Sequence, residues 1–249
     1  MHARLRVPIT FAWWEKAMEA LSDMMANLPP DSLLMALDPQ QIEALLKDAT
    51  RRDLKPDDVV INQGDENGDY AVYVLSGGLK IGFVSAGGRE IILSYCAPGE
   101  VVGEIALLDS GPRTATATAV VESSVLLLPS KNFLEAVSSS PASVARIMRE
   151  LAQRVRQQNL IIESDRTFSM GPRLARALVR LVDKDRTDGR LLYNPSQSDL
   201  GAFAGLAREN VSRLLSEWES QDIIARDGRT LTVRDVEYLR SLAEFGEET

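Results

Sequence analysis

The 249-residue sequence has almost none of the side chains that bind metals and redox groups, because cysteine and histidine occur once each, as Cys96 and His2. A single cysteine excludes an internal disulfide, a cysteine-ligated iron–sulfur cluster and a cysteine-based structural zinc site. His2 lies at a terminus of the kind that frays, which argues against histidine-ligated haem. We therefore expect a sensor in this chain to read an organic ligand, with no metal, haem or iron–sulfur cluster.

Long apolar runs are missing too. No stretch approaches the length that a membrane span needs. The first residues also lack a charged segment followed by a cleavable apolar core, which argues against export. The sequence thus predicts a cytoplasmic protein of ordinary globular composition without contact to a membrane, and its length suits two modest domains.

A basic excess is absent: the net charge is −8 and the pI is near 4.9. This sign disfavours non-specific binding of nucleic acid, so any DNA binding should depend on a local patch and specific contacts. Acidic residues crowd the first half of the chain. A basic stretch follows between residues 173 and 190, comprising Arg173, Arg176, Arg180, Lys184, Arg186 and Arg190 against Asp183, Asp185 and Asp188.

The first thirty residues are expected to be a helical extension. Its apolar residues recur at three- and four-residue spacing, namely Trp14, Met18, Leu21, Met25 and Leu28. Pro29 and Pro30 end the pattern. Packing against the chain's own sensor domain or a dimer mate is favoured over membrane anchoring.

Short β-rich segments separated by turn residues occupy the chain from Leu54 to Leu128. The expected strands are Val59–Ile61, Ala71–Leu75, Leu79–Val84, Glu90–Tyr95, Thr114–Val120 and Ser124–Leu128. Many short strands at close spacing indicate an antiparallel sandwich or barrel, and the spacing alone does not choose between them.

A long helix with a heptad seam is expected next, beginning at Pro141, which suits a first helical turn. The seam consists of Val144, Met148, Leu151, Val155, Gln158 and Ile162. Such a pattern predicts a two-stranded coiled coil and hence a homodimer, the alternative being a helix packed on its own domain. Arginines at 146, 149, 154 and 156 keep the flanks polar. Gly171-Pro172 is expected to break the chain as a hinge.

The C-terminal part has the order of a winged helix-turn-helix. Pro172–Val182 is expected to be helical, and Ser196–Phe203 follows as a short helix with Ser196 as N-cap and Asp199 three residues on. Gly205 ends that helix, and Arg208–Trp218 forms the next one. Ile223–Arg226 and Thr230–Arg234 then flank Asp227-Gly228, a pair typical of two-residue hairpins.

These segments together predict an α+β multidomain protein with an antiparallel β domain, a long dimerisation helix and a C-terminal winged helix-turn-helix; the resemblance given below implies that the β domain is a jelly-roll. The expected boundaries are residues 1–30 for the extension, 31–140 for the β domain, 141–170 for the dimerisation helix and hinge, 171–240 for the winged helix-turn-helix and 241–249 for an acidic tail.

The string Gly103-Glu104-Ile105-Ala106-Leu107-Leu108, followed by Pro112-Arg113-Thr114-Ala115, carries the chemistry of a phosphate site. Gly103 allows backbone to approach an anion closely, and a short helical turn beginning near Ile105 presents N–H groups. Arg113 provides a charged donor fork and Thr114 a further donor. Glu104 is an acceptor suited to a ribose hydroxyl.

This string resembles the phosphate-binding cassette of cyclic-nucleotide-binding domains almost residue for residue. From Leu54 to about Val236 the chain resembles the cyclic AMP receptor (catabolite activator) branch of the Crp–Fnr superfamily. Supporting strings are Gly64-Asp65, Ile92-Leu93-Ser94-Tyr95 and the seven residues from Ala207 to Arg213. The resemblance implies that Gly103 and Glu104 bind ribose, that Ala106, Arg113 and Thr114 bind the cyclic phosphate, and that Ile81 and Val102 lie against sugar and base.

Two departures leave the base open. Where the family reads adenine with a Thr-Ser pair on the long helix, one residue reaching across the dimer, this chain has Gln158 and Asn159. Amides can donate to or accept from either purine. Thr114 occupies a position at which threonine binds the guanine amine in some relatives, yet it also occurs in domains that bind cyclic AMP. Both nucleotides remain candidates for the effector.

The helix from Arg208 is expected to read DNA, since side chains at the N-terminal end of such a helix meet base edges in the major groove. Arg208 and Arg213 suit guanine, and Glu209 can accept from the cytosine amine. The resemblance implies that these residues, with Asn210, contact palindromic half-sites close to TGTGA. Phosphate contacts are expected from Ser196, Gln197 and Ser198.

The implied mechanism is regulatory. A nucleotide beside Gln158 and Asn159 lengthens or straightens the coiled coil through Phe168–Pro172, which brings two recognition helices about one DNA turn, ~34 Å, apart. RNA polymerase is a further implied partner, either recruited or blocked. A ligand-independent regulator is one alternative. An enzyme that turns over cyclic nucleotides is another, disfavoured because the sequence has no histidine base, nucleophile motif or metal cluster.

Overall fold

The computed structural model describes residues 37–246 except 67, 186–188, 190, 192 and 229. The helix expected within residues 1–30 therefore lies outside the described residues. The described chain divides into two compact units, of which the first comprises residues 37–80 and 96–154 and the second residues 81–95 and 155–246. Within the described residues, no helix is long and apolar enough to cross a membrane.

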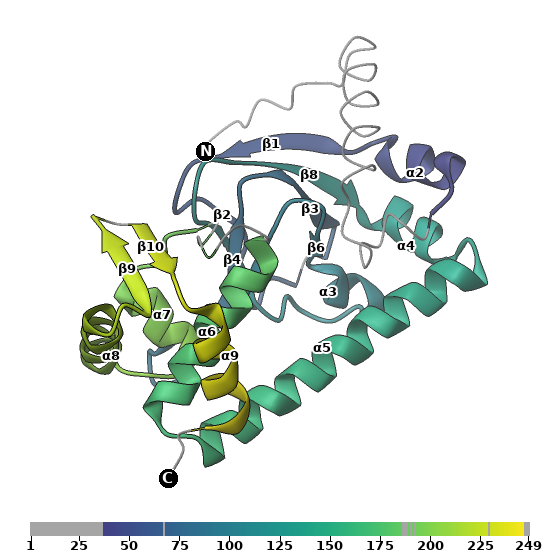
Figure 1. Cartoon of the computed structure of the whole chain (residues 1–249). Helices are drawn as coiled ribbons and strands as arrows, with labels where there is room; N and C mark the ends of the chain where they lie inside the picture. Colours follow the sequence, from purple (N-terminus) through teal and green to yellow (C-terminus); the bar gives the residue numbers. More distant parts are fainter. Residues whose placement is uncertain are drawn as a thin grey trace. The chain divides into compact units, whose positions relative to one another are not determined.

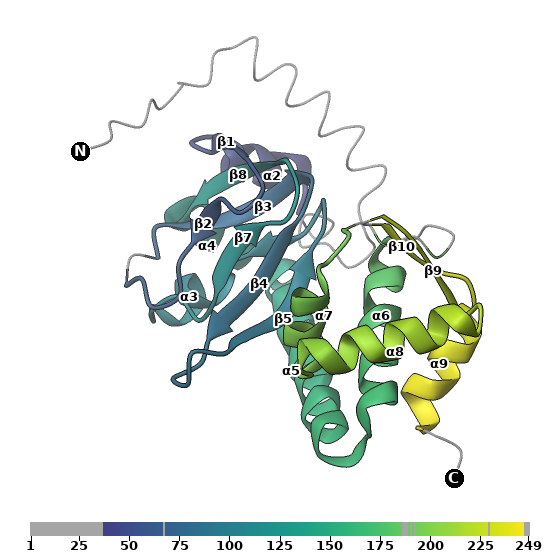
Figure 2. The same cartoon turned by 90° about the vertical axis from the view of Figure 1, so that its left-hand side faces the viewer.

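Two four-stranded sheets form the β-sandwich (Figure 1). One sheet has the order β1-β8-β3-β6, built from Thr50–Leu54, Ser123–Pro129, Tyr70–Ser76 and Val101–Val102. The other has the order β2-β7-β4-β5, built from Val59–Ile61, Thr116–Ala119, Leu79–Val84 and Glu90–Cys96, and is visible in Figure 2. The six predicted strands are thus confirmed to within two residues at each end. Of the two architectures that the strand spacing left open, the two separate sheets show a sandwich and not a barrel.

The order of the first sheet places β6, which leads into Gly103, beside a buried strand. β3 lies between β8 and β6, pairing antiparallel with both, and Val72 is opposite Leu127 on one side and Val102 on the other. β3 is buried along most of its length because Ala71, Val72 and Val74 are apolar and fully covered. The start of the phosphate cassette is therefore anchored to a largely buried strand of the first unit.

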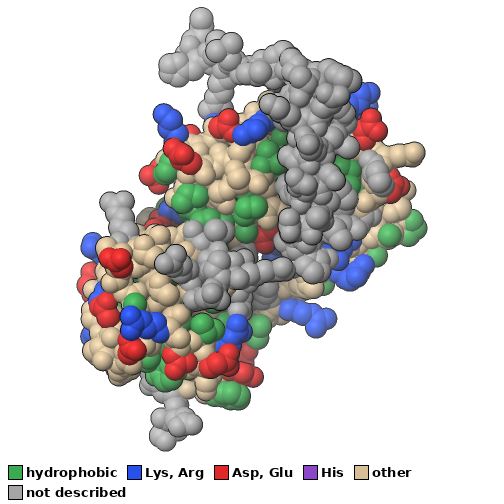
Figure 3. All heavy atoms as spheres, turned by 45° about the horizontal axis from the view of Figure 1, so that its top comes forward, with side chains coloured by type: hydrophobic (Ala, Val, Ile, Leu, Met, Phe, Trp, Pro, Cys, Tyr) green, Lys and Arg blue, Asp and Glu red, His purple; other side chains and the backbone are tan. Residues whose placement is uncertain are grey.

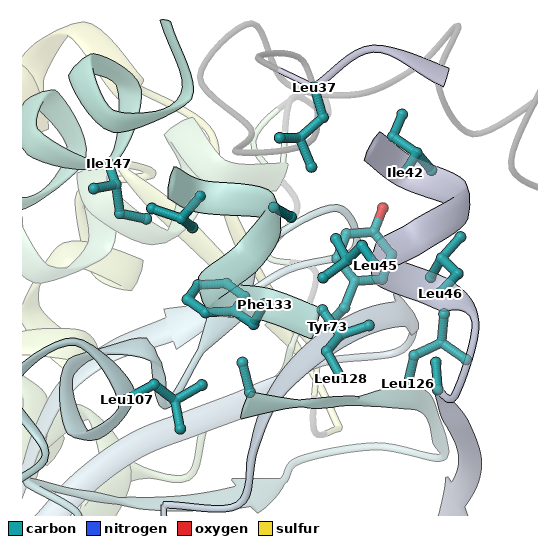
Figure 4. Packing of buried hydrophobic residues seen from close by; sticks show 14 residues of the cluster. Leu37, Ile42, Leu45, Leu46, Tyr73, Leu107, Leu126, Leu128, Phe133 and Ile147 are labelled. Carbon is teal, nitrogen blue, oxygen red and sulfur yellow. The ribbon is translucent and has the colours of Figure 1, made fainter. Parts of the chain in front are cut away.

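The core of the first unit joins sheet to helices, as Figure 4 shows. Helix α2 (Pro39–Leu46) begins at Asp38, whose carboxylate and the Gln41 side chain form a capping box. Helix α4 (Ser130–Ser138) contributes Phe133, which is fully buried beside Tyr73 and Leu128. Neither helix was predicted from the sequence.

Helix α5 (Pro141–Thr167) is continuous and begins at the expected proline. Ile147 is buried in the core of the first unit. Four seam residues on another part of the helix surface remain exposed, namely Val144, Met148, Val155 and Ile162, while Leu151 and Gln158 are half-buried. The described part of the chain therefore leaves four of the six predicted seam residues exposed.

The expected chain break at Gly171-Pro172 is wrong. Helix α6 runs from Met170 to Asp185, so both residues lie in its first turn, and the non-helical step is Phe168-Ser169. A proline in a first turn costs no helical hydrogen bond, because its nitrogen would have no partner there in any case. The interruption therefore comes two residues earlier than the Gly-Pro pattern suggests.

The helix-turn-helix is confirmed. Helix α7 (Gln197–Ala204) begins after Ser196, which forms the predicted capping box with Asp199. Gly205 ends it in the left-handed region at φ 68°, where a side chain would be strained. Helix α8 (Arg208–Ser220) then buries Val211, Leu214, Leu215 and Trp218.

The wing and a final helix complete the second unit. Strands β9 (Ile224–Asp227) and β10 (Thr230–Val233) pair antiparallel with Asp227 opposite Thr230. The hairpin connection therefore begins at Gly228, one residue later than predicted. Helix α9 (Val236–Phe245) is capped by Asp235 and packs on α6. The residues from 241 expected to form a tail thus begin as helix.

Candidate nucleotide and DNA sites

The cassette is built on a left-handed glycine. Gly103 has φ 87° and directly precedes α3 (Glu104–Asp109), one residue before the predicted start of a helical turn. A Cβ at this position would lie 2.8 Å from Nη1 of Arg113 and 2.7 Å from Cδ1 of Ile61, closer than real Cβ contacts allow. Glycine is therefore required here for both conformation and space.

Arg113 is held beneath this glycine. Its Nη1 donates to the Gly103 carbonyl at 2.7 Å and its Nη2 to the Tyr70 carbonyl at 2.5 Å. The guanidinium carbon lies 5.1 Å from the centre of the Tyr70 ring, and the residue is 4% exposed. These contacts fix the fork in one orientation while its remaining N–H groups stay available to an anion.

The early turn Gly64-Asp65 fixes the backbone of the same arginine. The Gly64 N–H donates to the Arg113 carbonyl at 2.8 Å, and the Arg113 N–H donates to the Asp65 carbonyl at 2.9 Å. Two strings that the sequence singled out separately therefore hold one residue from both sides.

Glu104 is a buried carboxylate at 4% exposure, paired with Arg154 of α5. The Oε1 atom accepts from Arg154, whereas the buried Oε2 atom has no hydrogen-bond partner among the described residues. Burial by itself lowers the pKa of Arg154, but the charge and hydrogen bond of Glu104 outweigh it and raise that pKa. A buried acceptor without a donor suits a ligand hydroxyl.

Arg154 was not predicted as a site residue, because the sequence places it among the polar flanks of the seam. The only available signal is that a buried acid in the cassette needs a cation, and sequence spacing does not say which arginine supplies it. The other predicted cassette residues differ in exposure: Ala106 is buried, Val102 and Ile105 are half-buried and Thr114 is exposed.

The remaining predicted nucleotide residues lie in the second unit. Ile81 of β4 is 9% exposed, while Gln158 of α5 is half-buried and Asn159 is exposed. Among the described residues, no group of three or more histidine, cysteine, aspartate or glutamate side chains is arranged to hold a metal ion.

The recognition helix presents the expected polar residues. Arg208, Glu209 and Arg213 are exposed in the first two turns of α8. Helix periodicity places Glu209 and Arg213 opposite buried Val211. Arg208 lies on the same side as Val211, one turn before it, at the exposed start of the helix. Asn210 is half-buried and its N–H donates to the Ala207 carbonyl. The three exposed side chains are thus accessible to a ligand on the surface of the second unit.

The residues before and within α7 are engaged to different degrees. The Ser196 hydroxyl donates to Asp199 Oδ2 at 2.6 Å, so it already serves the capping box. Gln197 is half-buried and Ser198 is exposed at the start of α7.

The basic stretch of α6 is used inside the second unit. Arg173 donates to the carbonyls of Ala204 and Gly205, at the turn between α7 and α8. Arg176 and Arg180 also donate to main-chain carbonyls. On the face shown in Figure 3, acidic and basic side chains are interspersed and neither sign forms one large patch.

Comparison with known proteins agrees with this geometry. Residues 51–140 match the family described as Cyclic nucleotide-binding domain, and residues 172–242 match the Crp-like helix-turn-helix domain. The chain is 30% identical over 214 residues to the Cyclic AMP receptor protein of Thermus thermophilus, covering 86% of this chain and 97% of that protein. It is 27% identical over 212 residues to the CRP-like cAMP-activated global transcriptional regulator of Mycobacterium tuberculosis, covering 83% and 94%.

A solved structure shows the same fold. FixK2 from Bradyrhizobium japonicum superposes with a TM-score of 0.69 at 24% identity, covering 78% of this chain and 96% of that one.

Proposed function

Because this chain belongs to the CRP/FNR family of transcription regulators, we propose that it is a homodimer in which cyclic AMP or cyclic GMP controls binding to palindromic DNA. The family consists of regulators and not of enzymes, and the chain is a CRP-like regulator with a cyclic-nucleotide-binding domain. The nature of the nucleotide, the dimer and the half-site are the parts that we propose.

The observation that carries the ligand proposal is the pairing of a free buried acceptor with a fixed cation. Glu104 Oε2 is buried without a partner, and Arg113 is oriented by two carbonyls. A ribose hydroxyl satisfies the first and a cyclic phosphate the second. Gly103 leaves room for the Arg113 guanidinium, since a side chain there would collide with it.

Base selection is assigned to Thr114, Gln158 and Asn159. The Thr114 side chain is exposed and has one hydroxyl donor, while both amides can serve either purine. Two of the relatives carry cyclic AMP in their names. Ile81 and Val102 would supply apolar contact to sugar and base.

Dimer formation is assigned to α5. The exposed fractions of Met148, Val155 and Ile162 are 64%, 60% and 49%, although these are apolar residues spaced as a seam. A second copy of the helix would cover them. The two-fold symmetry of such a dimer accounts for a palindromic DNA site.

DNA reading is assigned to α8. Arg208 and Arg213 would pair with guanines, and Glu209 would accept from a cytosine amine, in half-sites close to TGTGA. Asn210, Ser196, Gln197 and Ser198 would add polar and phosphate contacts. The non-helical step at Phe168-Ser169 would let bound nucleotide set the spacing of two recognition helices at about one DNA turn, ~34 Å.

The test is calorimetric titration of the full chain with cyclic AMP and cyclic GMP in parallel. Tight binding of one nucleotide is expected, and Arg113→Ala should abolish it. The same preparations are then titrated into a fluorescent duplex carrying two TGTGA half-sites, with and without the nucleotide. Binding that strengthens with nucleotide supports the proposal.

The outcomes of these titrations test the parts of the proposed function separately. Absence of heat with either nucleotide overturns the ligand assignment and favours a ligand-independent regulator of the same family. Equal DNA affinity with and without saturating nucleotide overturns the regulatory coupling, because a ligand can act only by binding one arrangement better than another.

A further inference from the structure

A strand at the edge of a sheet and the first helix of the helix-turn-helix share one buried contact. β5 is an edge strand in the order β2-β7-β4-β5, and its residues 90–95 belong to the same compact unit as α6 and α7. Edge strands carry main-chain groups without a strand partner, which are open to other donors. Here the Leu93 carbonyl accepts from Arg180 Nη2 of α6 at 2.9 Å.

The same arginine lies on an aromatic group. Its guanidinium carbon is 4.3 Å from the centre of the Phe203 ring of α7. The Tyr95 ring of β5 meets the Phe203 ring edge-on at 5.3 Å and 89°, and it stacks on Tyr193 at 5.8 Å and 22°. We refer to Tyr95, Arg180, Tyr193 and Phe203 as the Arg180 cluster.

The Arg180 cluster is desolvated. Tyr95, Tyr193 and Phe203 are 2%, 4% and 8% exposed. Burial, followed by repulsion from Arg176, lowers the pKa of Arg180 to about 10. A cation–π contact is stronger when water is excluded from it. The Arg180 cluster is therefore a buried contact that joins β5, α6 and α7.

The Arg180 cluster is close in sequence both to the cassette and to α8. Tyr95 is followed by Cys96, then β6, and then Gly103 and Glu104 of the cassette. Phe203 lies two residues before Gly205, and α8 begins three residues after that glycine. A shift of β5 reaches α7 through Arg180 and Phe203, and a shift of α7 changes the placement of Arg208.

We propose that Arg180 is a positioning residue that couples nucleotide binding at the cassette to the orientation of the recognition helix, by holding α7 on the edge of β5. This inference rests on the proposed nucleotide-controlled DNA binding. Coupling of this kind requires contacts that differ between two arrangements. In the proposal, the Arg180 cluster is made in one arrangement and would be broken in the other.

The test compares DNA affinity with and without the nucleotide identified by calorimetry, using a fluorescent duplex with two TGTGA half-sites. Arg180→Met keeps the apolar stem but removes the donors and the charge. Phe203→Leu keeps apolar volume but removes the ring. The ratio to be compared is the DNA affinity with nucleotide divided by the DNA affinity without it. Each variant is expected to lower this ratio at least tenfold, toward one. The affinity for the nucleotide itself should stay within about twofold of the wild-type value.

The matched control is Arg240→Met, which removes an arginine from α9 whose ion pair is with Glu237 of the same helix. This variant should keep the wild-type ratio. Urea unfolding of each variant shows whether it is folded under the assay conditions. The double variant Arg180→Met, Phe203→Leu should have a ratio no lower than that of the stronger single variant, since both changes disrupt the same contact.

The failures are distinguishable. A wild-type chain whose DNA affinity does not respond to nucleotide overturns the proposed function and the coupling with it. A responsive wild type with an unchanged ratio in Arg180→Met overturns the coupling alone. Equal weakening of DNA binding with and without nucleotide also overturns it, because that result marks Arg180 as purely structural.

Discussion

Arg154 of the long helix α5 donates a hydrogen bond to Glu104, the first residue of the cassette helix α3. The Glu104 side chain is 5% exposed and the Arg154 side chain 41%, so the acid is buried while its partner reaches in from the surface. The residue that we propose binds ribose is thus fixed by the helix that carries the seam. A ligand that engages Glu104 acts directly on a contact of α5.

Replacing Arg154 by methionine should leave Glu104 buried without its cation. We expect the free energy of unfolding to fall by about 1–3 kcal/mol, toward the lower end because Arg154 is partly solvated. Nucleotide affinity should fall on the order of tenfold, about 1.4 kcal/mol. Urea unfolding and calorimetry measure the two effects.

Arg156→Met provides the control for this change, since Arg156 is exposed on the same helix. If Arg154→Met binds nucleotide as tightly as Arg156→Met, the contact with Glu104 has no part in the site.

The cassette shows why some of the site could be predicted from sequence and some could not. Gly103, Glu104 and Arg113 lie within one short string, and local chemistry assigns each a part. Arg154 comes from another element, and its approach to Glu104 depends on how α5 packs on the sandwich. Heptad spacing predicts which face of α5 forms the seam, but it does not predict which flanking arginine points inward.

Replacing Gly103 by alanine tests the cassette backbone. Its φ of 87° is unfavourable for alanine, and the added Cβ would lie 2.8 Å from Arg113 Nη1. We expect a loss of about 1–3 kcal/mol in stability and a clear weakening of nucleotide binding. Gly88→Ala is the matched control, because its φ is 76° but no atom lies within 4 Å of the added Cβ. Equal nucleotide affinity in the two variants would contradict a special role for Gly103.

Replacing Val155 by glutamate tests the dimer. Val155 is 60% exposed in the single chain, so the change should not disturb the fold of the chain itself. In a dimer it would bring two buried like charges together at the seam, and we expect the dissociation constant to rise on the order of 100-fold. Analytical ultracentrifugation measures this. Gln153→Glu adds the same charge at an exposed position off the seam and should leave the dimer intact. A dimer that survives Val155→Glu would place the interface elsewhere.

The fold was predictable where a local signal exists. Ser196 with Asp199 predicted the start of α7, and Gly205 its end, because capping depends on neighbours in sequence. β1 was missed, since its sequence, Thr50–Leu54, is mostly polar and becomes a strand by pairing with β8. The arginines of α6 were expected as a basic patch, yet Arg173, Arg176 and Arg180 donate to carbonyls far away in sequence. Only tertiary structure shows that use.

Replacing Arg208 by alanine separates base reading from phosphate binding. Arg208 is exposed in the first turn of α8, three residues before buried Val211. A guanine contact predicts a loss of about 1–3 kcal/mol on the TGTGA duplex and a much smaller loss on a duplex changed at one base pair of each half-site. Binding to a series of singly substituted duplexes identifies that position. A uniform loss on every duplex, together with a shallower dependence on salt, would instead assign Arg208 to a phosphate, because counterion release does not depend on sequence.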